Sequence, residues 1–309
     1  MSVLLLTHRA CLLHDPGEFH PECPDRLRAV LRALEAEEFC PLIRAEAPEA
    51  TPEQLCRAHP AGYVDAILSI RPEPGEPVPL DGDTVMSAGS AEAALRAAGA
   101  GIAAVDAVCL GEVRRAFCAT RPPGHHAEPG RPMGFCLFAN AVVAARHAQA
   151  AHGLGRVAIV DFDVHHGNGS QAGVETDPSI LFASSHQWPC YPGTGDARER
   201  GVGNVFNANL PPGADGTAFR AAWRDKLLPA VDAFAPELLV ISAGFDAHAR
   251  DPLAQLRVRE ADFAWLTEAL CGLADRHAGG RVVSLLEGGY DLDALASSAA
   301  AHVRALMQA

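Results

Sequence analysis

The segment RVAIVDFDVHHGNG, residues 156–169, changes within a few positions from an apolar run to a dense polar cluster. The run is short and rich in Val and Ile, which is typical of a strand that is buried on both faces. The polar cluster contains aspartates and histidines at close spacing. Five more apolar runs of this kind occur along the chain, at residues 3–8, 114–120, 179–185, 237–246 and 281–290.

Helical patterns separate these runs. Strands that alternate with helices indicate an α/β fold with a mostly parallel sheet and helices on both faces. The 309 residues are 49% hydrophobic, which is enough for a large core, and the segment 71–83 is the best candidate for a long surface loop. We therefore expect a single domain over residues 1–309. The expected helices are at residues 25–37, 53–70, 90–110, 136–152, 217–233, 259–277 and 293–308.

The composition disfavours several classes of function. A formal net charge of −13 argues against a nucleic-acid-binding surface. The nine cysteines are an odd number without a CxxC pair, which favours reduced thiols in a cytosol over disulfides or a cysteine zinc site. The apolar run after Ser2 is too short for a signal peptide, and no segment has the length of a membrane span. We expect a cytoplasmic enzyme without a nucleic-acid or membrane partner.

Polar clusters follow four of the apolar runs. In a parallel α/β sheet, residues beyond the carboxyl ends of the strands face one crevice, and ligands bind there. We therefore expect segments that are distant in sequence to form one site. These segments are RPPGHH (121–126), DFDVHHGNG (161–169), AGFDAH (243–248) and EGGY (287–290).

The cluster DFDVHHGNG has the donors of a divalent-metal site. Asp161, Asp163 and His165 are spaced by two, so an extended backbone places them on one side. Carboxylate and imidazole ligands suit a metal of the zinc type, and Asp246 supplies a third ligand. A set of Asp163, His165 and Asp246 leaves positions open for water and substrate, as a catalytic metal requires. Ligand types alone leave zinc and ferrous iron as alternatives. For any one of these aspartates alone, a helix cap or an ion pair is the simpler interpretation.

Proton transfer needs further groups near such a metal. His125 and His126 are adjacent on a loop shaped by Pro and Gly, and they are candidates for this role. Asp161 and Asn168 are candidates to orient them, one each. Tyr290 follows two glycines that let the backbone turn tightly, so its hydroxyl can donate to an oxyanion. Taken alone, Tyr290 is better explained as a core tyrosine with a satisfied hydroxyl.

The motifs, taken in order, resemble the zinc-dependent histone deacetylase family, in particular its class II branch and the bacterial histone deacetylase-like amidohydrolases. The resemblance extends from HPECPDRL (20–27) to the EGGY segment, nearly the whole chain. It implies the arginase–deacetylase fold, with a parallel eight-stranded sheet flanked by helices. It also implies hydrolysis of an Nε-acyl-lysine amide. The motifs are RPPGHHA (121–127), GFCLF (134–138), DFDVHHGNGSQ (161–171), YPGTG (191–195), SAGFDAH (242–248) and LEGGYD (286–291).

The resemblance also implies roles for individual residues. Of the tandem histidines, His126 would act as general base and then as acid, and His125 as an electrostatic partner tied to Asp161. Asn168 matches the position behind His126, and Tyr290 matches the tyrosine that stabilises the transition state. The zinc ligands that the resemblance implies are Asp163, His165 and Asp246.

The same resemblance implies a substrate tunnel, an exit and ion sites. Arg26 matches an arginine below the metal that helps acetate to leave. Asp83 matches an acid at the rim that holds the substrate backbone, and Tyr191 matches an aromatic wall. The tunnel positions are Gly134, Phe135, Tyr191, Leu253, Asp83 and Gly289. Family members also bind potassium, and the matching residues are Asp161, Asp163, His165, Ser184 and Ser185.

Other functions share parts of this pattern. An acetylpolyamine deacetylase has the same catalytic residues, but its eukaryotic branch carries a Glu seven residues after the third metal ligand, where this chain has Leu253. The expected substrate is therefore an acyl-lysine protein or peptide, with a small acylated amine as the alternative. An arginase-like hydrolase needs a second metal and more carboxylates. A non-catalytic acyl-lysine binding module does not need Tyr290 or the His pair. The oligomeric state stays open.

Overall fold

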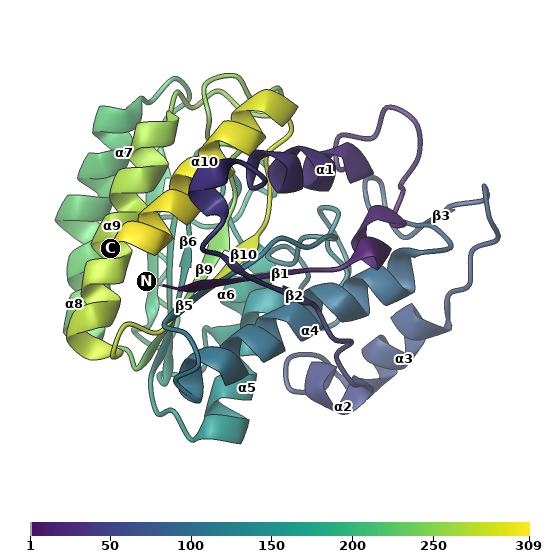
Figure 1. Cartoon of the computed structure of the whole chain (residues 1–309), viewed down its shortest axis with the longest axis horizontal. Coiled ribbons are helices and arrows are strands. Elements are labelled where there is room, and N and C mark those ends of the chain that lie inside the picture. Colours follow the sequence, from purple (N-terminus) through teal and green to yellow (C-terminus); the bar gives the residue numbers. More distant parts are fainter. Residues whose placement is uncertain (1) are drawn as a thin grey trace.

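A parallel sheet forms the centre of the molecule (Figure 1). The structure is a computed structural model and describes residues 2–309. Its large sheet has the strand order β2-β1-β5-β10-β9-β6-β7-β8, and all of its pairs are parallel. The predicted α/β class and the eight-stranded sheet are confirmed. The strands are β1 (Val3–Thr7), β2 (Ile43–Glu46), β5 (Arg115–Cys118), β6 (Val157–Asp161), β7 (Ile180–Gln187), β8 (Val205–Leu210), β9 (Leu238–Ala243) and β10 (Val282–Leu286).

The two edge strands are the ones that the apolar runs do not predict. All four residues of β2 are exposed, so that strand lacks the continuous apolar pattern of a buried one. Strand β8 has the sequence VFNANL, in which asparagines interrupt the apolar residues. The six apolar runs correspond to the other strands, because those are covered on both faces. Among them, β10 comes last in the sequence and lies between β5 and β9.

Helices cover both faces of the sheet, as predicted (Figure 1). On one face lie α1, α7, α8, α9 and α10; on the other lie α4 and α5, with α2 and α3 packed against them. Within residues 2–309, no helix has an apolar stretch long enough to cross a membrane. The helices are α1 (Pro24–Ala33), α2 (Pro52–Leu55), α3 (Ala61–Ser69), α4 (Ser90–Cys109), α5 (Asn140–His152), α6 (Asn168–Val174), α7 (Gly216–Ala222), α8 (Leu228–Phe234), α9 (Glu260–His277) and α10 (Leu292–Gln308).

The central strands contribute to both cores in alternation. In β6, Ala158 and Val160 belong to the apolar cluster under α9 and α10. Val157 and Ile159 point the other way, into the cluster under α4 and α5. All four are fully buried, because successive side chains of a strand point to opposite faces. This packing holds the strand ends, and the loops that follow them, in fixed positions.

Four predicted helices differ from the structure. The helix expected at residues 25–37 ends at Ala33. Residues 53–70 form two helices, and Pro60 is the N-cap of the second. Residues 217–233 are divided by a π-helical turn, Trp223–Leu227. The helix expected at residues 136–152 begins only at Asn140, because the chain before it turns sharply at Phe135, which has a φ of 69°. The expected surface loop 71–83 contains the short strand β3 (Val78–Pro79), which pairs with β4 (Val85–Met86) in a hairpin.

Candidate functional site

A pocket of about 200 Å³ opens at the carboxyl ends of the central strands. Three of the four polar segments reach it through side chains that line it, and the fourth contributes Asp246 behind His165. The sequence argument that these segments converge therefore agrees with the structure. The lining residues are Asp83, His126, Gly134, Phe135, His165, Tyr191, Leu253 and Tyr290.

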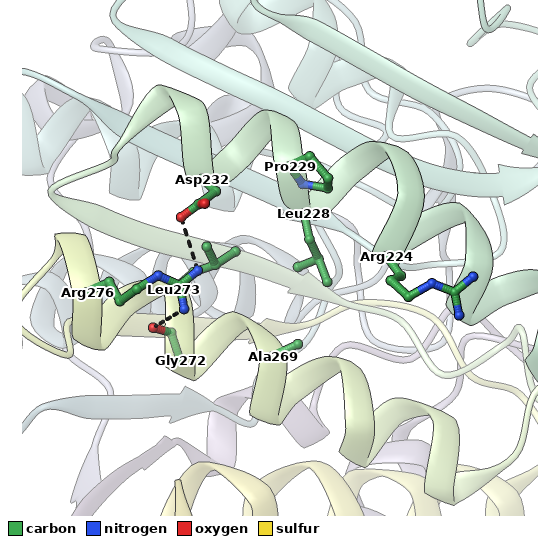
Figure 2. Close-up of a pocket in the computed structure, with 8 residues that line it drawn as sticks. All are labelled: Arg224, Leu228, Pro229, Asp232, Ala269, Gly272, Leu273 and Arg276. Atoms are coloured by element: carbon green, nitrogen blue, oxygen red, sulfur yellow. Dashed lines mark hydrogen bonds and ion pairs between the residues drawn. The ribbon is translucent and has the colours of Figure 1, made fainter.

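A larger hollow of about 420 Å³ lies between α8 and α9 (Figure 2). All of its lining residues belong to helical segments, and its ion pair, Asp232 with Arg276, is about half exposed. None of the residues that line this larger hollow is a buried titratable group. We therefore place the candidate site in the smaller pocket, although the hollow between α8 and α9 has the larger volume.

Three side chains converge beside the pocket with the geometry of metal ligands. His165 Nδ1 lies 3.1 Å from Asp163 Oδ1 and 3.1 Å from Asp246 Oδ2. Atoms that share a tetrahedral ion at bonds of about 2.0 Å are separated by roughly 3.3 Å. The predicted set of Asp163, His165 and Asp246 therefore fits a divalent metal in both donor type and spacing.

Backbone amides orient the two carboxylates. Asp163 accepts hydrogen bonds from the amides of His165 (2.9 Å) and Gly288 (2.8 Å), and Asp246 accepts one from Val164 (2.8 Å). These contacts join the ends of β6, β9 and β10. The ligand positions are therefore set by the sheet as well as by the local sequence.

Two glycines leave room for the carboxylates. A Cβ atom at Gly244 would lie 2.0 Å from Asp163 Oδ2, and one at Gly288 would lie 2.1 Å from Asp246 Oδ2. Neither position admits a side chain while the carboxylates stay in place. Gly244 of AGFDAH and Gly288 of EGGY thus allow the backbone to approach the two carboxylates closely.

The charges of this cluster also favour a cation. Burial, and after it the charge of Asp163, raise the pKa of Asp246 to about 7. The ligand atoms of Asp163, His165 and Asp246 lie within 4.8 Å of one another. Two buried carboxylates that are so close are costly unless a positive charge lies between them. A bound metal ion would supply that charge.

The tandem histidines lie with their rings 3.9 Å apart between centroids. His125 Nδ1 is 3.0 Å from Asp161 Oδ2, and His126 Nδ1 is 2.8 Å from Asn168 Oδ1. A carboxylate and an amide oxygen both accept, so each Nδ1 carries a proton and donates. In a neutral His126, Nε2 is then free to accept a proton.

The two histidines have opposite pKa shifts. Burial would lower the pKa of His125, but the charges of Asp163 and Asp161 outweigh it and raise that pKa to about 10. For His126, burial and the positive charges of His125 and His165 lower the pKa well below its ordinary value. His125 is therefore cationic and His126 neutral, so only His126 can act as a base near neutral pH.

Tyr290 and Arg26 lie together at the other side of the pocket. The guanidinium carbon of Arg26 is 4.9 Å from the centre of the Tyr290 ring. Burial raises the pKa of Tyr290 well above its ordinary value, against the opposing effect of Arg26, so its hydroxyl stays protonated and can donate. Arg26 is fully buried, and its role in product exit stays a prediction.

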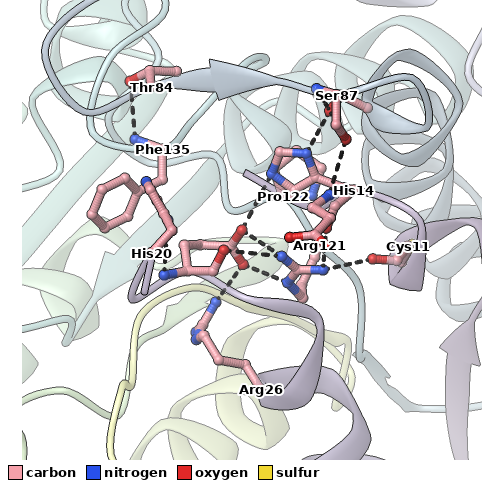
Figure 3. Close-up of polar contacts among 12 residues, drawn as sticks. Cys11, His14, His20, Arg26, Thr84, Ser87, Arg121, Pro122 and Phe135 are labelled. Carbon is pink, nitrogen blue, oxygen red and sulfur yellow. Dashed lines mark hydrogen bonds and ion pairs between the residues drawn. The ribbon is translucent and has the colours of Figure 1, made fainter. Parts of the chain in front are cut away.

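A buried ion-pair network holds Arg26 in place. Arg26 and Arg121 both bond to the carboxylate of Glu22, and Arg121 Nη1 also donates to the carbonyl oxygens of Cys11 and His14 (Figure 3). Arg121 directly precedes the loop with the His pair. The network therefore fixes the start of that loop relative to Arg26.

The pocket walls are shaped by Asp83 and its neighbour. Asp83 Oδ1 accepts from the amide of Gly134 (3.1 Å), and Thr84 Oγ1 accepts from that of Phe135 (3.1 Å). Gly134 has a φ of 57°, and a Cβ atom there would lie 2.4 Å from the His126 ring. The amide contacts hold this turn in the left-handed region, which is unfavourable for Phe135 by itself.

Two further tunnel residues lie at the opening, and one does not line it. The centroid of the Tyr191 ring lies 5.1 Å from that of the His126 ring. Leu253 lies at the mouth of the pocket, and 37% of it is exposed. Gly289, which was predicted with the tunnel, is not among the lining residues. Its carbonyl oxygen instead accepts a hydrogen bond from Arg26 Nε (2.6 Å), and a Cβ atom at Gly289 would lie 2.9 Å from Leu295 Cδ1 of α10.

The residues expected at a potassium site lie beside the metal cluster. Ser184 pairs with Asp161 in the β6–β7 register. The hydroxyls of both serines already have protein partners: that of Ser184 contacts His186, and that of Ser185 accepts from Trp223. An ion there would have to use mainly backbone oxygens of these serines.

A second group of possible ligands, Asp106, His147 and His152, has a different geometry. Both imidazole Nε2 atoms lie 2.7 Å from the same oxygen of Asp106, which is a hydrogen-bond distance and shorter than metal ligands allow. Arg57 also donates to Nδ1 of His147, so Nε2 carries the proton. This group ties α4 to α5 through hydrogen bonds.

Sequence reasoning missed two buried carboxylates that contact the site. Asp251 accepts from the amides of Tyr290 (2.8 Å) and Leu253 (3.0 Å). Glu287 accepts from the amides of Gly124 and His125. An acid directly after an apolar strand, as in EGGY, is the only sequence signal, and it does not reveal which amides the acid contacts.

The sequence and the fold of this chain were compared with those of known proteins. A family model described as the histone deacetylase domain matches residues 20–306. The chain belongs to the histone deacetylase family. The resemblance inferred from the motifs is thereby confirmed.

Individual members of the histone deacetylase family are similar over most of the chain. Histone deacetylase 14, chloroplastic, of Arabidopsis thaliana is 40% identical, over 98% of this chain and 76% of that protein. A histone deacetylase-like amidohydrolase of Pseudomonas aeruginosa is 41% identical, over 88% of this chain and 72% of its own. The crystal structure of the HDA15 HD domain has a TM-score of 0.91 at 37% identity, covering 99% of this chain and 90% of that one.

Proposed function

We propose that residues 1–309 form a single catalytic domain that removes acetyl or other acyl groups from the ε-amine of lysine in proteins or peptides. One observation carries the proposal: three metal-type ligands, the two tandem histidines with their separate partners, and Tyr290 gather at one narrow pocket. The cysteine usage of the chain supports a cytoplasmic location.

The ligand set Asp163, His165 and Asp246 would hold zinc, with ferrous iron as the alternative. The metal supplies Lewis-acid activation of water and of the acyl carbonyl. We also propose a potassium ion near Asp161, Ser184 and the ligands Asp163 and His165, with Ser185 as a further contributor. Its charge would balance part of the negative charge of this region.

The chain's own residues move the protons. Nε2 of His126 accepts a proton from the attacking water and later gives it to the leaving amine. His125, held cationic by Asp161, orients and stabilises the charge that develops beside it. The hydroxyl of Tyr290 donates to the developing oxyanion. Each role follows from the protonation state that the surroundings impose.

The pocket walls suit an extended aliphatic stem. Phe135 and Tyr191 provide aromatic walls, and Asp83 at the rim can accept hydrogen bonds from a substrate backbone. Arg26, buried below Tyr290, is a cation that would attract the carboxylate product and assist its exit. These assignments predict that long side chains with a terminal amide are bound end-on.

A polyamine substrate is the second candidate. A relative named polyamine deacetylase HDAC10, of Homo sapiens, is 40% identical over 96% of this chain and 46% of that protein. Leu253, exposed at the mouth, cannot pair with a distal ammonium group, which favours the lysine-type substrate. Hydrolysis of acetyl-lysine peptides, longer acyl-lysine peptides and acetylspermidine should be measured side by side with metal content. A kcat/KM that is highest for acetylspermidine would reverse this preference.

Variants of the ligands test the metal assignment. Asp163→Ala, His165→Ala and Asp246→Ala should each remove activity and most of the bound metal, because three ligands leave none to spare. Asp106→Asn, in the hydrogen-bonded group on α4, is the matched control and should keep both. A ligand variant with full metal content and full rate would contradict the assignment.

A further inference from the structure

Glu287 is a buried acid for which the proposed chemistry has no use. It directly follows β10, and its side chain is 1% exposed. It is also not among the residues that line the pocket. A carboxylate is costly to bury unless its oxygens are hydrogen-bonded, so its contacts indicate what it does.

The contacts of Glu287 join three strand ends. Oε2 accepts from the backbone amides of Gly124 (2.7 Å) and His125 (3.2 Å), in the loop after β5. Oε1 accepts from the hydroxyl of Ser242 in β9 (3.2 Å). One side chain thus satisfies two adjacent amides of the loop that carries the tandem histidines.

Other contacts hold the backbone of that loop through its carbonyl oxygens: that of Pro122 accepts from the side chain of Asn140, and that of His125 from the amide of Ser170. Pro122 and Pro123 have no amide hydrogen, so Gly124 and His125 offer the first amides after Arg121. A Cβ atom at Gly124 would lie 2.6 Å from the amide nitrogen of Asn140, so the chain is tightly enclosed there. The two amides are therefore the points at which the loop can be held from the side of β10.

The backbone of Glu287 belongs to the opposite side of the site. Its carbonyl oxygen accepts from Arg26, and the next amide, that of Gly288, donates to Asp163. Tyr290 follows three residues later. Glu287 therefore connects the segment that carries Tyr290 to the loop that carries His125 and His126.

We infer that Glu287 is a positioning residue, which sets the distance between the tandem histidines and Tyr290 by holding two backbone amides of the histidine loop. The inference rests on the proposed function for its effect on turnover. Glu287 acts as a hydrogen-bond acceptor, so glutamine can replace it: the amide oxygen accepts from the loop while the NH₂ group donates to Ser242. Leucine at position 287 would fill a similar volume but could accept no hydrogen bond.

Turnover and metal content provide the first test. Glu287→Leu should lose roughly 10²-fold in kcat, the effect of a misplacement of about 1 Å, with KM and bound metal changed by less than about threefold. Glu287→Gln should stay within a few-fold of the wild-type kcat. Thr267→Val removes a buried hydroxyl of α9 whose contacts are Phe263 and His302 and not the loop, so it controls for a general loss of stability and should keep the wild-type kcat. A Leu variant with wild-type kcat, or a Gln variant as slow as the Leu variant, would overturn the inference.

Amide hydrogen exchange tests the same contacts without turnover. In the wild-type protein, Gly124 and His125 should exchange at least 10²-fold more slowly than the amides of the exposed residues Glu73 and Gly75. Exchange at both should accelerate in Glu287→Leu and stay slow in Glu287→Gln. If the wild-type amides exchange as fast as the exposed ones, the inference fails even if the Leu variant does not fold. If they are protected but no acylated amine is hydrolysed, the proposed function fails and the anchoring contact stands.

Discussion

At the scale of single residues, His125 and His126 have the same side chain but different charges, because His125 is cationic and His126 is neutral. The difference comes from their surroundings: the charges of Asp163 and Asp161 favour the protonated ring of His125, whereas burial and the charges of His125 and His165 disfavour it for His126. The sequence offers Asp161 and Asn168 as partners, and only the resemblance to the family implies which histidine each one contacts. The 3.0 Å and 2.8 Å contacts assign one to each histidine.

We predict unequal losses when these histidines are replaced. His126→Ala should lose nearly all turnover while it keeps the metal, because the proton acceptor is gone. His125→Ala should keep a larger residual rate, since Nε2 of His126 remains. The double variant should be hardly slower than His126→Ala, because groups that act as a unit are not additive. Single-turnover rates at equal metal content check this, and the reverse order of the two single variants would exchange their roles.

Tyr290 offers a substitution that removes one atom. Tyr290→Phe should lower kcat roughly 10²–10³-fold, the usual effect of losing an oxyanion donor. KM should change much less, because the hydroxyl is needed mainly as charge develops. Steady-state kinetics of the two proteins, with metal content measured, provide the comparison. Near wild-type turnover in the variant would show that the hydroxyl does not stabilise the oxyanion.

At the scale of elements, the site depends on glycines that allow the segments after β9 and β10 to approach the carboxylates. Gly288→Ala should weaken metal binding roughly 10–100-fold, as expected when the orientation of the ligands is disturbed. Its Cβ atom would lie 2.1 Å from Asp246 Oδ2 and 2.6 Å from Asp163 Oδ2. Metal titration of the apoprotein measures the effect.

The matched control for this substitution is Gly272→Ala in α9. The nearest atom to a Cβ there is 4.0 Å away, and alanine favours a helix interior by about 1 kcal/mol over glycine. This variant should bind metal normally and unfold at a slightly higher denaturant concentration. Equal metal affinity in both glycine variants would show that the close contact of Gly288 with the two carboxylates does not affect metal binding.

Helices and strands can be predicted from the sequence where burial requires a recognisable pattern of apolar residues. Strands buried on both faces need continuous apolar residues, so six strands could be recognised, whereas the exposed IRAE of β2 carries no such pattern. The ligands Asp163 and Asp246 follow from their places after apolar runs. Glu287 and Asp251 could not be assigned, because their partners are backbone amides, which every residue except proline has.

At the scale of the whole molecule, buried histidines make stability depend on pH. His302 lies between the hydroxyls of Thr267 and Ser284, and burial lowers its pKa to about 3. The unfolded chain, with a pKa of 6.5 for this group, binds more protons than the folded one between these values. The contribution is therefore complete above pH 6.5 and is lost as the pH falls toward 3.

We predict that His302→Gln reduces this dependence. From pH 7 to pH 5, the wild-type protein should lose about 2 kcal/mol more unfolding free energy than the variant, because glutamine does not titrate. Glutamine can still bond to one or both hydroxyls. Denaturant unfolding at the two pH values measures the difference, and equal losses in both proteins would show that His302 is not held neutral.

The place of β10 between β5 and β9 has a consequence for biosynthesis. β5 pairs only with β1 and β10, and β9 only with β6 and β10, so the sheet exists as two separate halves until residue 286 has left the ribosome. The tandem histidines belong to the first half, whereas Asp163, His165 and Asp246 belong to the second. A nascent chain that ends before β10 therefore leaves two apolar strand edges unpaired, which are surfaces that chaperones recognise. The residues of the candidate site come together only when the last strand inserts, so under the proposed function the partly synthesised chain has no complete site.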